Sequence, residues 1–201
     1  MINIKRSTPP PESLAKEKAK KAGTYNCADV LERLQKDFLN KCNKDLKFDW
    51  NNLFFACGYC NNLKGKNYDN ILNCTNPEHD VENWIKYEIE PFPQSTPVIT
   101  SCRDDQMVEN TVQLLSAVYN GTTPNKLMGA ENLRSLLRDD ILKFQHYLKK
   151  YIRNDNDEKT RAYALKQIKQ NLKRSSSFAA FKRWIIKDDT RFNRDFSQYM
   201  D

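Results

Sequence analysis

The stretch NLFFACGYCNNLK spans residues 52–64 and contains the most closely spaced cysteines of the chain, Cys57 and Cys60. A Cys-x-x-Cys turn brings two thiolates to one side, where they can take two corners of a tetrahedral Zn²⁺ site. A redox dithiol or a pair of buried structural cysteines are the alternatives. The alternation of strand and helix that surrounds thioredoxin-like dithiols is absent here, so we favour metal binding.

The composition predicts a folded protein with a modest core. Of the 201 residues, 39% are hydrophobic and 29% are charged, which suits one ordinary domain or two small ones. The net charge of +7 is uneven: residues 1–23 hold six basic and two acidic groups, residues 24–140 twelve and seventeen, and residues 141–201 fifteen and seven. A basic last third suits a polyanion such as DNA, although a lysine-rich helix is often only a solvated face.

The first residues, MINIKRSTPPPE, contain no apolar signal segment, and no apolar run approaches the ~20 residues that span a bilayer. We therefore expect a cytoplasmic protein without a membrane partner, in which thiols stay reduced. Buried thiols are the expected state of three further cysteines, Cys27, Cys74 and Cys102.

Three regions follow from the pattern along the chain. We expect a basic N-terminal arm over residues 1–26, a finger module and connector over 27–100, and a helical domain over 101–201. Apolar residues at helical spacing predict a helix over 27–40, and an extended segment is expected over 84–89. Ser101 and Asp104 form a possible capping pair for the first helix of the last region. The helical stripes there are Val108, Val112, Leu115 and Val118; Leu133, Leu136, Leu137, Ile141, Phe144, Leu148 and Ile152; Leu165, Ile168 and Leu172; and Phe178, Phe181 and Ile185.

Residues 52–64 resemble the second half of the HNH endonuclease motif: Asn-Leu, a few apolar residues, Cys-x-x-Cys, His or Asn, and then Lys three residues on. Every element is present in that order. Residues 48–53 and 68–72 look more specifically like the HNH subunit of Septu-type antiphage defence systems, which is encoded beside an ATPase of the SMC and RecF kind. The basic arm and the helical second half are also similar to that subgroup. The resemblance implies a mainly α protein with a small, zinc-stabilised ββα-metal finger.

The resemblance also implies the zinc ligands. Three thiolates are in register with the family pattern, those of Cys42, Cys57 and Cys60. The position three residues after Cys42, where the family has a further cysteine, is Asp45 in this chain. The fourth ligand is therefore open: Asp45 is an uncommon type of zinc ligand, and Cys74 could supply a ligand if Cys42 is displaced.

Metal-assisted hydrolysis of a DNA phosphodiester bond is the activity that the resemblance implies, with Mg²⁺ or Mn²⁺ as the catalytic ion. Asn52 would brace the catalytic loop, and Asn61 would lie on the finger helix facing that ion. Lys64 and Lys66 follow directly and are expected to contact phosphate, although solvent exposure is the plainer alternative.

The general base of the family is missing at its usual place. Family members carry a Glu-His or Asp-His segment before the Trp-x-Asn-Leu stretch, whereas only residues 43–49 separate Cys42 from Trp50 here. Relative to the pattern, a segment of about twenty residues is absent and the finger is truncated. The only histidines, His79 and His146, are expected in a surface loop and in a helix, and neither is expected to replace the base.

These observations leave three functions open. The first is an HNH endonuclease subunit working with DNA and an SMC/RecF-like ATPase. The second is a catalytically inactive zinc-finger module that binds DNA or protein. The third is a cytosolic helical protein in which the Cys-x-x-Cys is incidental.

Overall fold

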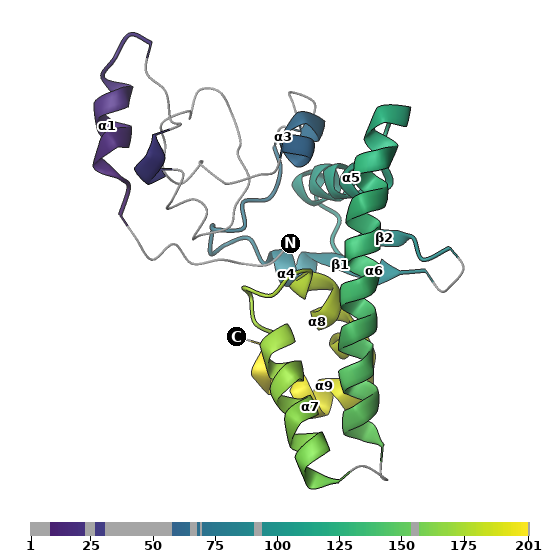
Figure 1. Cartoon of the computed structure of the whole chain (residues 1–201). Helices are drawn as coiled ribbons and strands as arrows, with labels where there is room; N and C mark the ends of the chain where they lie inside the picture. The colour runs from purple at the N-terminus through teal and green to yellow at the C-terminus, as the bar shows by residue number, and fades with distance from the viewer. Residues whose placement is uncertain are drawn as a thin grey trace.

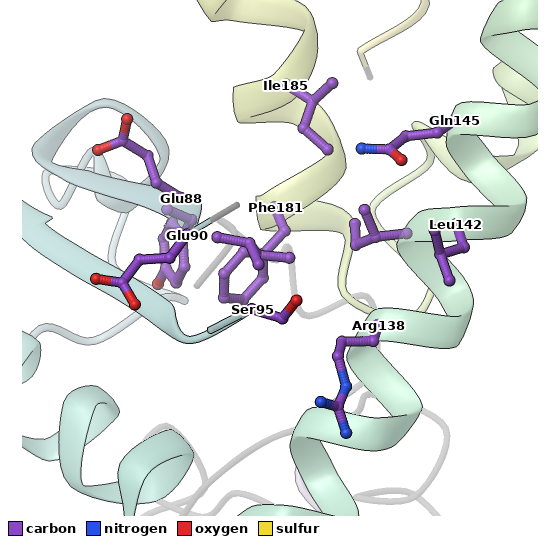
Figure 2. A pocket seen from close by; sticks show the side chains of 11 residues that line it. Glu88, Glu90, Ser95, Arg138, Leu142, Gln145, Phe181 and Ile185 are labelled. Atoms are coloured by element: carbon purple, nitrogen blue, oxygen red, sulfur yellow. The ribbon is translucent and has the colours of Figure 1, made fainter. Parts of the chain in front are cut away.

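The computed structural model describes residues 9–22, 27–30, 58–64, 68, 70–90, 94–153 and 157–200. Figure 1 shows the described part as mainly helical, with one small antiparallel sheet, and this confirms the mainly α class. The elements in chain order are α1 (Glu12–Lys18), α3 (Gly58–Lys64), α4 (Val81–Trp84), β1 (Ile85–Ile89), β2 (Pro97–Ser101), α5 (Gln106–Asn120), α6 (Pro124–Ile152), α7 (Glu158–Asn171), α8 (Ala179–Asp188), α9 (Thr190–Phe196) and a 3₁₀ turn, η2 (Ser197–Tyr199).

The sheet joins two segments that are separated in the sequence by the proline-containing residues 90–96. β1 confirms the extended segment expected over 84–89, while β2 was not predicted. The two strands pair antiparallel, with Tyr87 opposite Ile99 and Ile89 opposite Pro97. Proline is compatible with β2 because it occupies the first position of the strand.

Aspartate side chains begin three of the helices. Asp105 accepts hydrogen bonds from the backbone N–H groups of Met107 and Val108 and so begins α5. The predicted capping role of Ser101 is therefore wrong: Ser101 ends β2, and its hydroxyl donates to the carbonyl oxygen of Arg103. The same capping geometry occurs at Asp157 before α7 and at Asp189 before α9.

Two hydrophobic cores hold the helices together. The first joins the β1–β2 sheet to α5, α6 and α8, and the second lies where α6, α7, α8 and α9 meet. The first contains Leu72, Cys74, Val81, Ile85, Tyr87, Ile99, Val108, Leu137, Ile141 and Phe181, and the second contains Phe144, Leu148, Ile168, Leu172, Ile186 and Phe196. Residues on both sides of position 100 thus share the first core.

Two burial predictions fail. Leu136 was expected on the buried stripe of α6, but 61% of its surface is exposed, because it precedes the buried Leu137 by one residue and points about 100° away from it. Cys102 is exposed, whereas Cys74 is buried as expected and Cys27 is half-buried. Of the helix expected over 27–40, residues 28–30 are helical and the remainder lies outside the described residues. Within the described residues, none of the helices is both long and apolar enough to cross a membrane.

Candidate functional site

Helix α3 carries the predicted site residues that the structure describes. It begins at Gly58, inside the Cys-x-x-Cys turn, so Cys60 is its third residue and Asn61 its fourth. Lys64 is its last residue. The side chain of Asn61 and the whole of four other predicted site residues, Cys42, Asn52, Cys57 and Lys66, lie outside the described residues.

Tyr59 anchors α3 to the helical half of the molecule. Its hydroxyl donates a hydrogen bond of 2.9 Å to the carbonyl oxygen of Val118, near the end of α5. Its ring lies against Gly129 of α6, so closely that a Cβ added at Gly129 would be 2.6 Å from two ring carbons. Helix α3 is thus held by two helices through one side chain.

A small apolar cluster surrounds this anchor. Leu63 packs against Leu114, Ala117 and Val118, which lie on one side of α5. Cys60 is half-buried and packs at the edge of the same cluster. Partly buried neighbours complete it: Tyr59, Tyr68, Ile71, Tyr119 and Leu133. Helix α3 therefore shares its packing with α5.

Tyr119 lies beside Cys60 in this cluster. Burial raises the pKa of the Tyr119 phenol, and the negative charge of a Cys60 thiolate would raise it further. The Tyr119 phenol therefore stays neutral next to Cys60, and it adds no second negative charge beside a Cys60 thiolate.

Lys64 is the one predicted phosphate contact that the structure describes. It is only 8% exposed, although it ends α3 and was expected at the surface of the finger. Lysines can bury their aliphatic stem and keep the ammonium group at the surface. A phosphate contact by Lys64 stays a prediction.

Both histidines of the chain are described, and neither lies at α3. Nδ1 of His79 accepts a 2.9 Å hydrogen bond from the backbone N–H of Asn73, and the ring lies 6.1 Å from that of Trp84. His79 therefore orders the turn before α4. His146 is exposed on α6, and roughly 25 Å of helix axis separates it from Gly129, where α3 is anchored. His146 lies in a helix as predicted, and His79 lies in a loop but is half-buried; their non-catalytic roles stay predictions.

The chemistry of the donor set fits zinc better than magnesium. Thiolates are ligands for Zn²⁺, whereas Mg²⁺ takes oxygen ligands. Cys60 is half-buried at the start of a helix, a position that a structural zinc ligand can occupy. In the described ranges, no three His, Cys, Asp or Glu side chains come together to hold a metal ion. Since Cys42 and Cys57 lie outside those ranges, the zinc site stays a prediction.

The anchoring role of Gly129 is a feature that the sequence analysis missed. Glycine inside a helix costs roughly 1 kcal/mol relative to alanine, so its presence within α6 is a signal of a close approach by another element. The approaching element, α3, is separated from Gly129 by more than sixty residues of sequence. The signal gives the position of the contact but not its partner.

No family model, no curated protein and no solved structure matches this chain.

Proposed function

We propose that this chain is the HNH-type, metal-dependent DNA endonuclease subunit of an antiphage defence system. The observation that carries the proposal is the 52–64 stretch, in which every element of the second half of the HNH motif stands in order. The position of α3 supports it, because the helix begins within the Cys-x-x-Cys turn and so carries Asn61, as the finger requires.

The residues of the finger have separate roles in this proposal. Cys42, Cys57 and Cys60 hold a structural zinc, which fixes the start of α3. Asn52 braces the catalytic loop. Asn61 faces a bound Mg²⁺ or Mn²⁺, which stabilises the charge that develops on the phosphate when the DNA strand is cut. Lys64 and Lys66 hold the DNA backbone beside it.

The anchoring of α3 gives the finger a rigid support. A catalytic group must be held in its productive geometry within a fraction of an ångström, and groups on packed elements meet this need better than groups on loops. Tyr59 and Leu63 fix α3 against α5 and α6. In the proposal, the helical half positions the finger and also docks on an SMC/RecF-like ATPase.

A second function, a zinc finger that binds DNA or protein without cutting it, is favoured by the positions of the histidines. HNH cleavage needs a general base that takes a proton from water. His79 accepts the Asn73 N–H in the turn before α4, and His146 lies far along α6 from the anchor of α3. In the described part of the chain neither histidine lies at α3, so cleavage would need a base from the segment that family members carry between the positions of Cys42 and Trp50.

Mass spectrometry of the purified protein separates these functions. A denatured mass above 23.6 kDa by the weight of about twenty residues would show that a further segment exists, and the proposal expects the base within it. A native mass then counts bound zinc. A mass that agrees with the sequence, together with one bound zinc, would favour the binding module.

Plasmid cleavage tests the catalytic role directly. The protein is incubated with supercoiled DNA and Mg²⁺ or Mn²⁺, alone and with the ATPase. The variant Asn61→Ala should abolish cleavage, whereas Asn62→Ala, an exposed neighbour on α3, should leave it unchanged. Absence of cleavage by the wild-type protein under all these conditions, with zinc bound, would reject the nuclease. Equal loss in both variants would show that Asn61 has no special role.

A further inference from the structure

The basic charge of the chain is concentrated in one helical hairpin. Residues 141–174 hold ten basic and three acidic groups, a balance of +7 that equals the net charge of the whole protein. They include the second half of α6 and all of α7, which pack side by side at the end of the molecule far from α3 (Figure 1). The three acidic residues, Asp155, Asp157 and Glu158, fall within four positions of the sequence between the basic residues of the two helices.

The same pattern of side chains occurs on both helices of the hairpin. Lys-x-x-x-Tyr-x-x-Lys occurs in α6 with Tyr147 at its centre and in α7 with Tyr163 at its centre. Residues three and four apart are neighbours on one face of a helix. Each tyrosine therefore has one lysine a turn before it and one a turn after it: Lys143 and Lys150 on α6, and Lys159 and Lys166 on α7.

The two patterns meet at their centres. The rings of Tyr147 and Tyr163 lie 6.3 Å apart in an edge-to-face arrangement with an interplanar angle of 72°. The lysines of both helices thus surround one pair of aromatic rings. We call this surface the tyrosine–lysine face, and it consists of Lys143, Tyr147, Lys150, Lys159, Tyr163 and Lys166.

Four of the six side chains of the face are open to solvent. Tyr163 is 53% exposed, and Lys143, Lys159 and Lys166 are all exposed. Across the ranges that the structure describes, none of these three lysines forms an ion pair, in contrast to Lys182, which pairs with Asp140 inside the fold. Exposed like charges gathered on one surface, as these three lysines are, attract a polyanion.

We propose that the tyrosine–lysine face binds the sugar-phosphate backbone of DNA. Lysine ammonium groups neutralise phosphates, and a tyrosine hydroxyl can donate a hydrogen bond to a phosphate oxygen. Such contacts position a duplex without reading its sequence. The inference rests on the proposed function in one respect, that DNA is the partner. It assigns the main contact with the DNA backbone to the hairpin of α6 and α7 rather than to Lys64 or Lys66.

The position of the face relative to α3 suits one duplex that contacts both. Tyr147 follows Gly129 by about five full turns of α6, so both residues lie on the same side of that helix, roughly 27 Å apart along its axis. Figure 1 shows α3 and α7 on this common side, near opposite ends of α6. A duplex rises ~3.4 Å per base pair, so about eight base pairs cover this distance.

Two charge-matched variants of the full chain test the inference. The face variant carries Lys143→Gln, Lys159→Gln and Lys166→Gln. The control carries Lys16→Gln, Lys18→Gln and Lys21→Gln, which removes three exposed lysines of the N-terminal arm and gives the same net charge. Binding of a labelled duplex of about 24 base pairs, three times that estimated span, is measured over a series of salt concentrations.

The face variant should bind the duplex roughly tenfold or more weakly, and the slope of log affinity against log salt should become shallower by about 2 to 3, as expected for three lost phosphate contacts. The control should keep most of the affinity. Circular dichroism melts confirm that both variants are folded. Equal weakening in the two variants, or unchanged binding by the face variant, would overturn the inference while DNA remained the partner. A wild-type protein that does not bind DNA would overturn the inference and the proposed function together, whereas binding without cleavage would leave the inference standing.

Discussion

The ring of Tyr59 occupies the space where a side chain of residue 129 would begin. A Cβ built on Gly129 would lie 2.6 Å from Cδ2 and Cε2 of Tyr59, closer than such atoms approach in proteins. The Tyr59 hydroxyl is fixed at the same time by the carbonyl oxygen of Val118. Because the hydroxyl end of the ring is hydrogen-bonded, the ring cannot turn away without losing that bond. The position of α3 therefore depends on the absence of a side chain at residue 129 of α6.

Gly129→Ala should therefore destabilise the protein. Alanine is favoured over glycine in a helix interior by about 1 kcal/mol, but overpacking a close contact costs about 1–3 kcal/mol. We expect a net loss of roughly 1 kcal/mol in the free energy of unfolding, measured by denaturant titration. In a Tyr59→Ala background the clash is gone, and Gly129→Ala should there be neutral or stabilising. Stabilisation in both backgrounds would show that the ring does not constrain position 129.

Arg183→Met should be among the most damaging single substitutions. Arg183 is 2% exposed; its Nε and Nη2 donate to the carbonyl oxygen of Leu172 at 2.9 and 2.6 Å, and its Nη1 donates to Glu82 at 2.8 Å. Removing one member of a buried ion pair costs about 3–5 kcal/mol, because the other charge stays buried. Arg174→Met is the control: Arg174 lies 3.8 Å from Glu82 and is partly exposed, so its loss should cost less than about 1 kcal/mol. Similar costs for both would show that Glu82 is well solvated.

Residue patterns within a segment predicted the helices, whereas contacts between distant segments were not predictable. Ile168 and Leu172 lie on a 3.6-residue period, and both are buried as the period requires. Arg183 and Glu82 are about a hundred residues apart, and nothing local in the sequence relates them. β2 was missed because its first residue, Pro97, reads as part of a proline-rich connector when its pairing with β1 is unknown.

The candidate site was predictable to a smaller extent. The Cys-x-x-Cys turn and the position of Asn61 on a helix follow from a short, ordered motif, and α3 agrees with them. The docking of Tyr59 depends on α5 and α6, which the motif does not contain. The burial of Lys64 is not visible in the motif either. The repeated tyrosine and lysine pattern is visible in the sequence, but only the ring contact between Tyr147 and Tyr163 shows that its two copies form one face.

Two lysines should change stability with pH in opposite directions. Burial lowers the pKa of Lys182 below its usual value of 10.5, although Asp140 opposes this shift. The unfolded chain therefore binds more protons at this site than the folded chain, and the stability contributed by Lys182 rises as the pH climbs from below 10.5 towards 10.5. Hydrogen bonds to Glu88 and Asp188 raise the pKa of Lys86 instead. Its contribution is complete below 10.5 and is lost as the pH rises above that value.

Denaturant titrations between neutral pH and about pH 11 measure this contrast. The free energy of unfolding is compared between the wild-type protein and each of two variants, Lys182→Met and Lys86→Met. The free energy of unfolding of the wild type minus that of Lys182→Met should increase with rising pH. The same difference for Lys86→Met should decrease. Slopes of the same sign for both lysines would contradict the opposite environments that the structure gives them.

Removing the proposed zinc should loosen α3 and leave most of the helical half folded. Cys60 lies on α3, and neither of the two main cores contains a buried residue of that helix. Cys60→Ser should therefore lose the zinc counted by native mass spectrometry, while far-ultraviolet circular dichroism keeps most of its helical signal. Cys102→Ser, at an exposed position in the loop before α5, is the matched control and should keep the zinc.

Hydrogen exchange in the zinc-free protein should rise in α3 and at the end of α5 near Val118, where Tyr59 is bound, and should change little in α7. If Cys60→Ser kept its zinc, the proposed ligand set would be wrong, and if the whole chain unfolded on losing the metal, the helical half would depend on the finger rather than support it.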